Sequence, residues 1–280
     1  MRLSLRGLPI LGIVVGIALV AAGTVSASHS WGNYHWARTS NPFALKLGDN
    51  VTSAWDTYLS QASSDWSAST VLDTTVVAGS ANVRTCTPPS GRIEVCNRKY
   101  GFNGWLGVAG IWADGDHITK GYVKLNDSYF NTASYNTPAW RRLVTCQEIG
   151  HTFGLGHTDE TFNNANQGTC MDYTNDPDGG TGGASSTDPS NEHPNKHDFD
   201  QLVNIYTHLD STTTISADAP TGPGRGSGNG SSAAGANVDE HGLPSWASPA
   251  NGDVYVTDLG NGQRLIVHVF WIPPGLPGAR

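Results

Sequence analysis

A segment of eleven residues, from Gln147 to His157, constrains the fold more than any other part of the chain. Residues four apart share one face of an α-helix, so Gln147 and His151 are expected to point the same way. Glu148 is rotated by roughly 100° from Gln147 and stays near that face. Gly154 can adopt left-handed backbone angles, which are common where helices end. A sharp turn at this glycine would bring His157 back towards His151.

This spacing predicts a metal site. In the H-E-x-x-H motif, the side chains at positions i and i+4 bind zinc and the glutamate is the general base. The first of these positions is Gln147 here, so we expect His151 and His157 as ligands, with Gln147 as the third. A carboxamide oxygen adds no charge, like neutral imidazole, but carbonyl oxygens suit harder ions than zinc. Direct coordination by Gln147, coordination through water and no coordination all remain open.

A second motif follows the first. The sequence from Gly168 to Tyr173 contains Met171, the only methionine besides the initiator. Together the two motifs resemble those of the metzincin clan of zinc peptidases, of the matrixin, astacin and snapalysin type. The resemblance covers roughly residues 45–210 and includes strand-like stretches at 107–112 and 121–126. It implies that Met171 lies under the metal site, that Gly154 makes the turn, and that Tyr173 stabilises an oxyanion.

The resemblance implies a secreted zinc endopeptidase that acts on protein or peptide substrates. Glu148 would take a proton from water and pass it to the leaving amine. Because the first ligand is changed, a catalytically inactive binding or cell-surface protein on the same fold is the alternative. His193 and His197 could replace Gln147 as a ligand, although ordinary loop histidines are the simpler interpretation. Acidic residues near the motif could bind calcium, without the spacing of an EF-hand: Asp159, Glu160, Asp172, Asp176 and Asp178.

Four cysteines suggest two disulfides in an exported chain, and three pairings are possible. We expect Cys86–Cys96, which closes a short loop. We also expect Cys146–Cys170, which would join the metal-site helix to the methionine motif. Cys146 as a metal ligand is the alternative, but it does not share a helical face with His151.

The first 27 residues are typical of a secretory signal peptide. Arg2 and Arg6 precede an apolar run over residues 8–25, and small residues allow cleavage after Ala27. An uncleaved membrane anchor is the alternative, because the run is nearly long enough to span a bilayer. After cleavage we expect a secreted monomer without stable membrane association. The formal net charge of −8 argues against nucleic-acid binding, which requires a basic surface.

The rest of the chain predicts one α+β domain over residues 28–210. We expect a twisted, mostly parallel sheet whose antiparallel edge strand could bind an extended substrate. Helices are predicted over 49–66, over 138–154 with Thr137 as its N-cap, and over 198–209. Strands are predicted over 70–78, 105–113 and 118–125, residues 86–96 as a loop or hairpin, and His117 in a surface turn.

The C-terminal part is predicted to be separate from this domain. Residues 211–250 are rich in Gly and Ser and predict a flexible linker. Residues 251–280 predict a β-hairpin that turns at Asn261-Gly262. Because an isolated hairpin is only marginally stable, we expect it to dock on the main domain or to serve as an attachment element.

Overall fold

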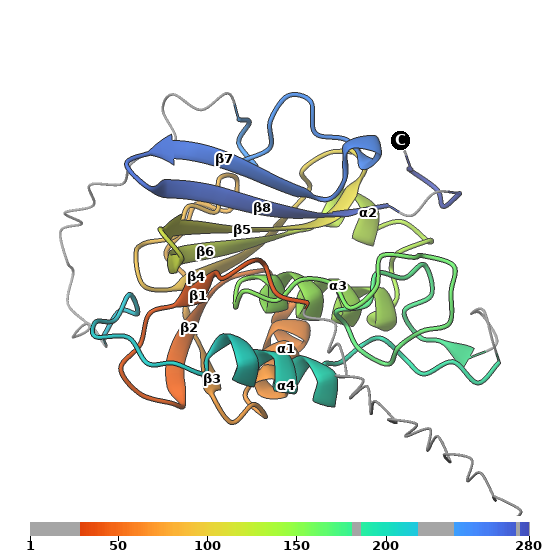
Figure 1. Ribbon diagram of the computed structural model, residues 1–280. Helices are drawn as coiled ribbons and strands as arrows, with labels where there is room; N and C mark the ends of the chain where they lie inside the picture. The colour runs from red at the N-terminus through yellow and green to blue at the C-terminus, as the bar shows by residue number, and fades with distance from the viewer. Residues whose placement is uncertain (1–28, 181–185, 218–237, 273–274, 280) are drawn as a thin grey trace, which may run out of the picture.

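The computed structural model describes residues 29–180, 186–217, 238–272 and 275–279. One large, twisted, mixed sheet carries its main helices on one face, which confirms the predicted α+β class (Figure 1). The expected signal peptide lies outside the described residues. Within the described part of the chain, no helix is both long and apolar enough to cross a bilayer.

The sheet has the strand order β3-β2-β4-β6-β5-β8-β7, and β1 pairs with β6. Its strands are β1 (His35–Trp36), β2 (Phe43–Asn50), β3 (Leu72–Ala78), β4 (Ile93–Arg98), β5 (Trp105–Asp114), β6 (His117–Asn126), β7 (Val254–Gly260) and β8 (Gln263–Trp271). The pairs among β1, β2, β3, β4 and β6 are parallel, and those that involve β5, β7 or β8 are antiparallel. One edge of the sheet is an antiparallel strand, β7, which belongs to the C-terminal hairpin that the sequence placed outside the domain over residues 28–210.

The helices are α1 (Asp56–Trp66), α2 (Asp127–Phe130), α3 (Pro138–His151) and α4 (Lys196–Ile205), and η2 (Pro249–Asn251) is a short 3-10 helix. As predicted, Thr137 caps α3, and its side chain accepts a hydrogen bond from the Trp140 N–H. The predicted start of the first helix at residue 49 was wrong, because residues 43–50 form β2 between two parallel neighbours. Residues 93–98 likewise extend as β4 inside the sheet, where the sequence suggested a loop or hairpin.

The two faces of the sheet bury separate clusters. The larger cluster packs α1 and α3 against the sheet. The smaller cluster lies on the opposite face, where Leu243 and its neighbours cover β5, β6 and β8. Leu243 lies near the C-terminal end of the expected linker, residues 211–250. Near its N-terminal end, the N–H groups of Thr214 and Ser216 donate to the carbonyls of Ala37 and Gly91. Residues 211–217 and 238–250 therefore pack on the domain.

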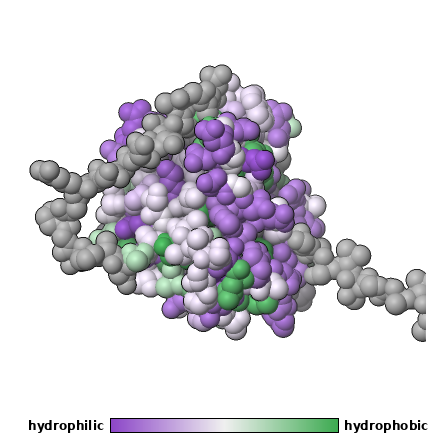
Figure 2. All heavy atoms as spheres, turned by 60° about the vertical axis from the view of Figure 1, so that its left-hand side comes forward, coloured by the Kyte–Doolittle hydropathy of each residue, from purple (hydrophilic) through white to green (hydrophobic). Residues whose placement is uncertain are grey.

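The C-terminal hairpin is part of the same sheet. It turns at Asn261 and Gly262, both of which have positive φ, as the sequence predicted. Strand β8 is buried on both faces: Ile266 and Phe270 pack in the helix-side cluster, and Val267 packs in the opposite one. The described surface in Figure 2 is mostly hydrophilic, with hydrophobic residues in small patches only. Docking of the hairpin thus completes the sheet.

Candidate metal centre

The end of α3 and the turn after it bring two predicted ligands together. His151 is the last residue of the helix. Gly154 has φ +94°, and a Cβ at this position would overlap the Tyr34 carbonyl oxygen. Glycine is therefore required here for both its backbone angles and its lack of a side chain. The chain reverses, and the His157 ring returns to 4.9 Å from the His151 ring, measured between centroids.

A third imidazole, which the sequence analysis did not select, comes from β8. The His268 ring lies 3.7 Å from the His151 ring and 4.5 Å from the His157 ring. One nitrogen from each of the three rings lies within 4.8 Å of the others. All three Nε2 atoms are buried and none has a hydrogen bond of good geometry, although His268 Nε2 lies 3.4 Å from Asp253 Oδ2. Such unpaired nitrogens are costly in a protein interior, and together they form a set of donors that could hold a metal ion.

The opposite nitrogens of two rings are occupied by second partners. His151 Nδ1 lies 2.8 Å from the Leu155 carbonyl oxygen, which can only accept, so this nitrogen carries the proton. His157 Nδ1 lies 3.1 Å from Asp253 Oδ2. Partners of this kind fix the tautomer and leave Nε2 free to bind a metal. Trp31 also stacks on the His151 ring, with centroids 5.1 Å apart and planes 10° apart.

Glu148, the predicted general base, lies beside this group. Its Oε2 lies 3.3 Å from His268 Nδ1, and its Oε1 has no hydrogen-bond partner. A Cβ added to Gly107 of β5 would come within 2.7 Å of that Oε1. The carboxyl group therefore packs directly against β5.

Burial and neighbouring charges shift the pKa values of four side chains in this centre, those of Glu148, His151, Asp253 and His268. Burial raises the pKa of Glu148, although the imidazoles of His268 and His157 partly oppose it. Burial, together with the other two imidazoles, holds the pKa of His151 well below its usual range. Burial alone would lower the pKa of His268, but Glu148 and Asp253 raise it to about 9. Burial would raise the pKa of Asp253, but His157 and His268 hold it well below its usual range.

These shifts describe an excess of negative charge around the imidazoles. Glu148 and Asp253 contribute two carboxylates, and a proton on His268 balances one of them. A divalent cation bound to three neutral imidazoles would balance both. The donor set and its charge therefore fit zinc, which commonly takes imidazole ligands.

Gln147 is close to the centre in sequence, but its side chain is fixed by hydrogen bonds to the backbone of the methionine motif. Its Nε2 donates to the carbonyl oxygens of Cys170, at 2.8 Å, and Asp172, at 3.2 Å. Because carbonyls only accept, the amide nitrogen must face them, and Oε1 faces elsewhere. That oxygen is buried and has no partner. The carboxamide therefore retains one unused acceptor in the interior.

The methionine motif lies behind α3, as the resemblance implies. Met171 is fully buried, and a Cβ added to Gly150 would come within 2.6 Å of its sulfur. Both expected disulfides are confirmed: Cys86–Cys96 and Cys146–Cys170. The second joins α3 directly to this motif, and the alternative of Cys146 as a metal ligand is wrong because its sulfur is in the disulfide.

Tyr173 stacks on the His157 ring, with centroids 4.8 Å apart. Its hydroxyl accepts a hydrogen bond from the Trp271 N–H at 2.6 Å and lies 3.2 Å from the Trp271 carbonyl oxygen. The hydroxyl that was predicted to stabilise an oxyanion is thus bonded to the backbone of β8 in this structure.

Other residues singled out in the sequence lie apart from the three imidazoles. His193 pairs with Asp65 at 2.6 Å, and His197 stacks on His29. Asp172 Oδ2 accepts hydrogen bonds from the Gln167 N–H and from Asn191. Among the described residues, Glu160 alone of the acidic residues proposed for calcium belongs to a group of converging ligands, with His157 and Asp253. Calcium binding stays a prediction without support from this geometry.

His268 and Asp253 are the residues that the sequence analysis missed. The stretch from Leu265 to Trp271 is apolar on both alternating faces except at His268. Such continuous runs are typical of strands buried on both sides. A single histidine inside such a strand was the signal, because a buried polar side chain requires a partner.

No protein-family model and no curated protein matches this chain. Among solved structures, the chain is similar to high choriolytic enzyme 1, a hatching enzyme zinc-protease from the medaka fish Oryzias latipes. The sequences are 13% identical, the TM-score is 0.34, and the match covers 62% of this chain and 94% of that chain. A match at this level is too distant to assign a family or a function.

Proposed function

We propose that this protein is an exported zinc-dependent peptidase of metzincin type, with Glu148 as its general base. The observation that supports this most strongly is the meeting of three buried imidazoles, with one nitrogen from each within 4.8 Å of the others, beside a buried glutamate. A zinc ion held there would supply the positive charge that polarises a carbonyl group and acidifies water. The two disulfides fit an oxidising compartment outside the cytosol.

The residues of the centre would have separate roles in metal binding and in proton transfer. His151 and His157 hold the ion through Nε2, with their other nitrogens fixed by Leu155 and Asp253. Glu148 has a free Oε1 that can accept a proton from water and return it to the leaving amine. The packing of Glu148 against Gly107 places this oxygen at the backbone of β5, where an extended peptide could pair with the strand.

The described arrangement is a closed form. Strand β8 pairs antiparallel with β5, and His268 lies opposite Ala109. Glu148, His151 and His268 have no exposed surface. Strand β8 therefore occupies the position that an extended protein or peptide substrate would take, and it must leave β5 before a peptide bond can reach the centre.

Opening would change the ligand set. When β8 leaves, His268 leaves with it, and two imidazoles remain on the α3 side. Gln147, whose Oε1 is buried without a partner, would then supply the third donor from the position of the missing motif histidine. We infer that the closed form uses three imidazoles and that the open form uses two imidazoles and a carboxamide.

One observation favours a second function. The complete burial of the centre under β8 is what a metal site with a purely structural role would show. The second candidate is therefore a catalytically inactive binding protein in which the hairpin never leaves.

Controlled release of the hairpin separates the two functions. A site for a specific protease is placed between Ala217 and Val238 of the full chain, and zinc content and casein hydrolysis are measured before and after cutting. Cutting makes hairpin binding intermolecular, so dilution should release it. We expect hydrolysis to rise on dilution of the cut protein and to fall by about 100-fold or more in the Glu148→Gln variant.

The Glu148→Gln variant is also the control for folding, because it should retain its zinc. Zinc binding without any Glu148-dependent hydrolysis, in both intact and cut protein, would support the inactive alternative. Absence of zinc from a folded chain purified with zinc present would contradict both functions.

A further inference from the structure

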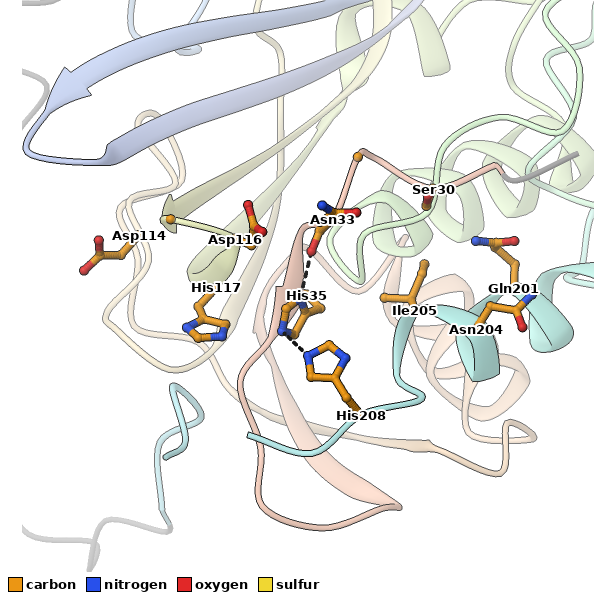
Figure 3. A pocket seen from close by; sticks show the side chains of 12 residues that line it. Ser30, Asn33, His35, Asp114, Asp116, His117, Gln201, Asn204, Ile205 and His208 are labelled. Carbon is orange, nitrogen blue, oxygen red and sulfur yellow. Dashed lines mark hydrogen bonds between the residues drawn. The ribbon is translucent and has the colours of Figure 1, made fainter. Parts of the chain in front are cut away.

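A second group of histidines lies at the surface, away from the candidate peptidase centre. It comprises His35 in β1, His117 at the start of β6, and His208 and Asp210 in the segment after α4. The three histidines border an open polar cavity of about 640 Å³ (Figure 3). Three segments that are far apart in the sequence therefore meet at one place.

The four side chains converge on one oxygen. Asp210 Oδ1 lies 3.2 Å from His117 Nε2 and 3.6 Å from the Nε2 atoms of both His35 and His208. The His35 and His208 rings point toward each other, with their Nε2 atoms 3.2 Å apart (Figure 3). Ligands about 2.0–2.1 Å from a tetrahedral zinc ion are separated by roughly 3.3 Å. These four distances are close to the edges of a zinc coordination tetrahedron, and His35, His117 and Asp210 form one group of ligand atoms within 4.8 Å of one another, whereas His208 lies beside His35 and Asp210 only.

The protons also point to a cation. His35 Nδ1 lies 2.7 Å from the Asn33 carbonyl oxygen, so Nδ1 carries the proton of the neutral ring. His35 Nε2 is then an acceptor, yet it faces the Asp210 carboxylate and a second imidazole nitrogen. His208 Nε2–H can donate to His35 Nε2, and a cation bound among these atoms would take the place of that proton and accept lone pairs from the imidazoles and the carboxylate.

The supporting contacts resemble those around built metal sites. Asp210 Oδ2 accepts hydrogen bonds from the backbone N–H and the guanidinium of Arg38, at 3.1 and 3.0 Å. The Arg38 guanidinium also donates to the His208 carbonyl oxygen. Partners of this kind orient ligands before a metal binds. The side chains of His117 and His208 are 42% and 57% exposed, so an ion can enter from solvent.

We propose that His35, His117 and Asp210 bind a structural zinc ion and that His208, which lies beside His35 and Asp210, completes the ligand set. Three imidazoles and one carboxylate are suitable ligands for zinc, and four protein ligands leave no open position for catalysis. The ion would tie the N-terminal segment and the segment after α4 to the start of β6. Backbone connections already join these segments: β1 pairs with β6 over two residues, the Asp210 and Thr214 N–H groups donate to the carbonyls of Arg38 and Ala37, and the His35 N–H donates to the Asp116 carbonyl.

This tie would also support the buried centre. The N-terminal segment that carries His35 places Trp31 on the His151 ring, and the Gly156 N–H donates to the His29 carbonyl. Loss of the surface ion would therefore loosen a segment that packs against the buried imidazoles.

Metal analysis of the full chain tests this proposal. Zinc per chain is measured after purification with zinc and gel filtration, for the wild type and for a His117→Ala/His208→Ala double variant. Both side chains are exposed, so the variant should fold. We expect the double variant to bind one zinc ion fewer than the wild type. His193→Ala removes an exposed histidine outside the group and should change nothing.

Cobalt substitution provides a second measurement that does not depend on stability. Cobalt titrated into the metal-free wild type should give the strong visible absorption of four-coordinate sites, and the double variant should lose the share contributed by this site. The proposal is overturned if wild type and double variant bind equal zinc and give equal cobalt spectra, which would show a hydrogen-bonded histidine cluster. It stands if the buried centre proves empty, because the wild type would then bind one zinc ion that His151→Ala does not remove.

Discussion

Among the described residues, histidines gather at the buried centre, at the surface centre and at the stacked pair His29–His197, and the first two groups differ mainly in access. The buried centre joins three imidazoles whose rings have almost no exposed surface, and its nearest carboxylates are Glu148 and Asp253. The surface centre also joins three imidazoles, but two are open to solvent and a carboxylate lies among them. The comparison shows that donor type alone does not define a role. At the proposed surface site, the Asp210 carboxylate would occupy the fourth ligand position. At the buried centre, the Glu148 carboxylate lies beside the ligands and could accept and donate protons.

The largest expected effect comes from removing the imidazole that β8 supplies. His268→Ala should lower the zinc affinity of the buried centre by about 100-fold or more, since even loss of a second partner costs 10–100-fold. The surface centre should keep its ion. Zinc per chain, measured at limiting free zinc, should therefore fall by one.

Ile266→Ala is the matched control, because Ile266 lies two residues away on the same face of β8 and has no donor atom. If this variant loses as much zinc as His268→Ala, the effect belongs to the packing of the hairpin. The imidazole would then not be a ligand.

The next effect concerns the replaced histidine of the motif. Gln147→His should restore zinc binding in the His268→Ala background to within about 10-fold of wild type, because the new imidazole would lie four residues before His151. The gain is limited because an imidazole can keep only one of the two hydrogen bonds that Gln147 makes to Cys170 and Asp172. Isothermal titration with zinc measures the recovery.

Gln147→Ala in the same background is the control, and it should not recover zinc. Equal behaviour of the two substitutions would mean that position 147 does not face the metal. The inferred ligand set of the open form would then be wrong.

A smaller effect concerns the rates at which the two centres release zinc. A chelator in excess should remove zinc from the surface centre first, since its ligands are exposed. Release from the buried centre requires local opening of the hairpin, and each 1.4 kcal/mol of opening free energy slows it about tenfold. The absorbance of the chelator complex should therefore rise in two phases. The His117→Ala/His208→Ala variant should lose the fast phase, and a single phase in the wild type would contradict the difference in access.

The sequence predicted the local parts of the buried centre because those parts are encoded by short spacings. The positions of His151, Gly154 and His157 follow from one helix and one turn, and Thr137 marks where that helix begins. The disulfide Cys86–Cys96 was predictable because it closes a short loop, and Cys146–Cys170 because it would join the metal-site helix to the methionine motif.

The long-range parts were not predictable in the same way. His268 lies 117 residues after His151 in the chain, and its place depends on β8 pairing with β5, which no local pattern specifies. The surface centre depends on β1 lying beside β6, a pairing of two residues only. In both cases a histidine in a strand or turn looked ordinary until the sheet brought its partners together.

The smallest effect tests how β8 is held over the buried centre. Tyr173→Phe removes the hydroxyl that accepts from the Trp271 N–H, and a buried unpaired N–H costs about 1–3 kcal/mol. We expect the unfolding free energy to fall by that amount and the cut hairpin to dissociate more readily. Tyr206→Phe is a matched control, because its buried hydroxyl bonds to Trp36 and Phe153 instead. If Tyr173 holds β8, its loss should raise hydrolysis by the cut protein at concentrations where the hairpin is still bound. If Tyr173 instead stabilises the oxyanion, hydrolysis should fall at every concentration, so the sign of the change distinguishes a fastening role from a catalytic one.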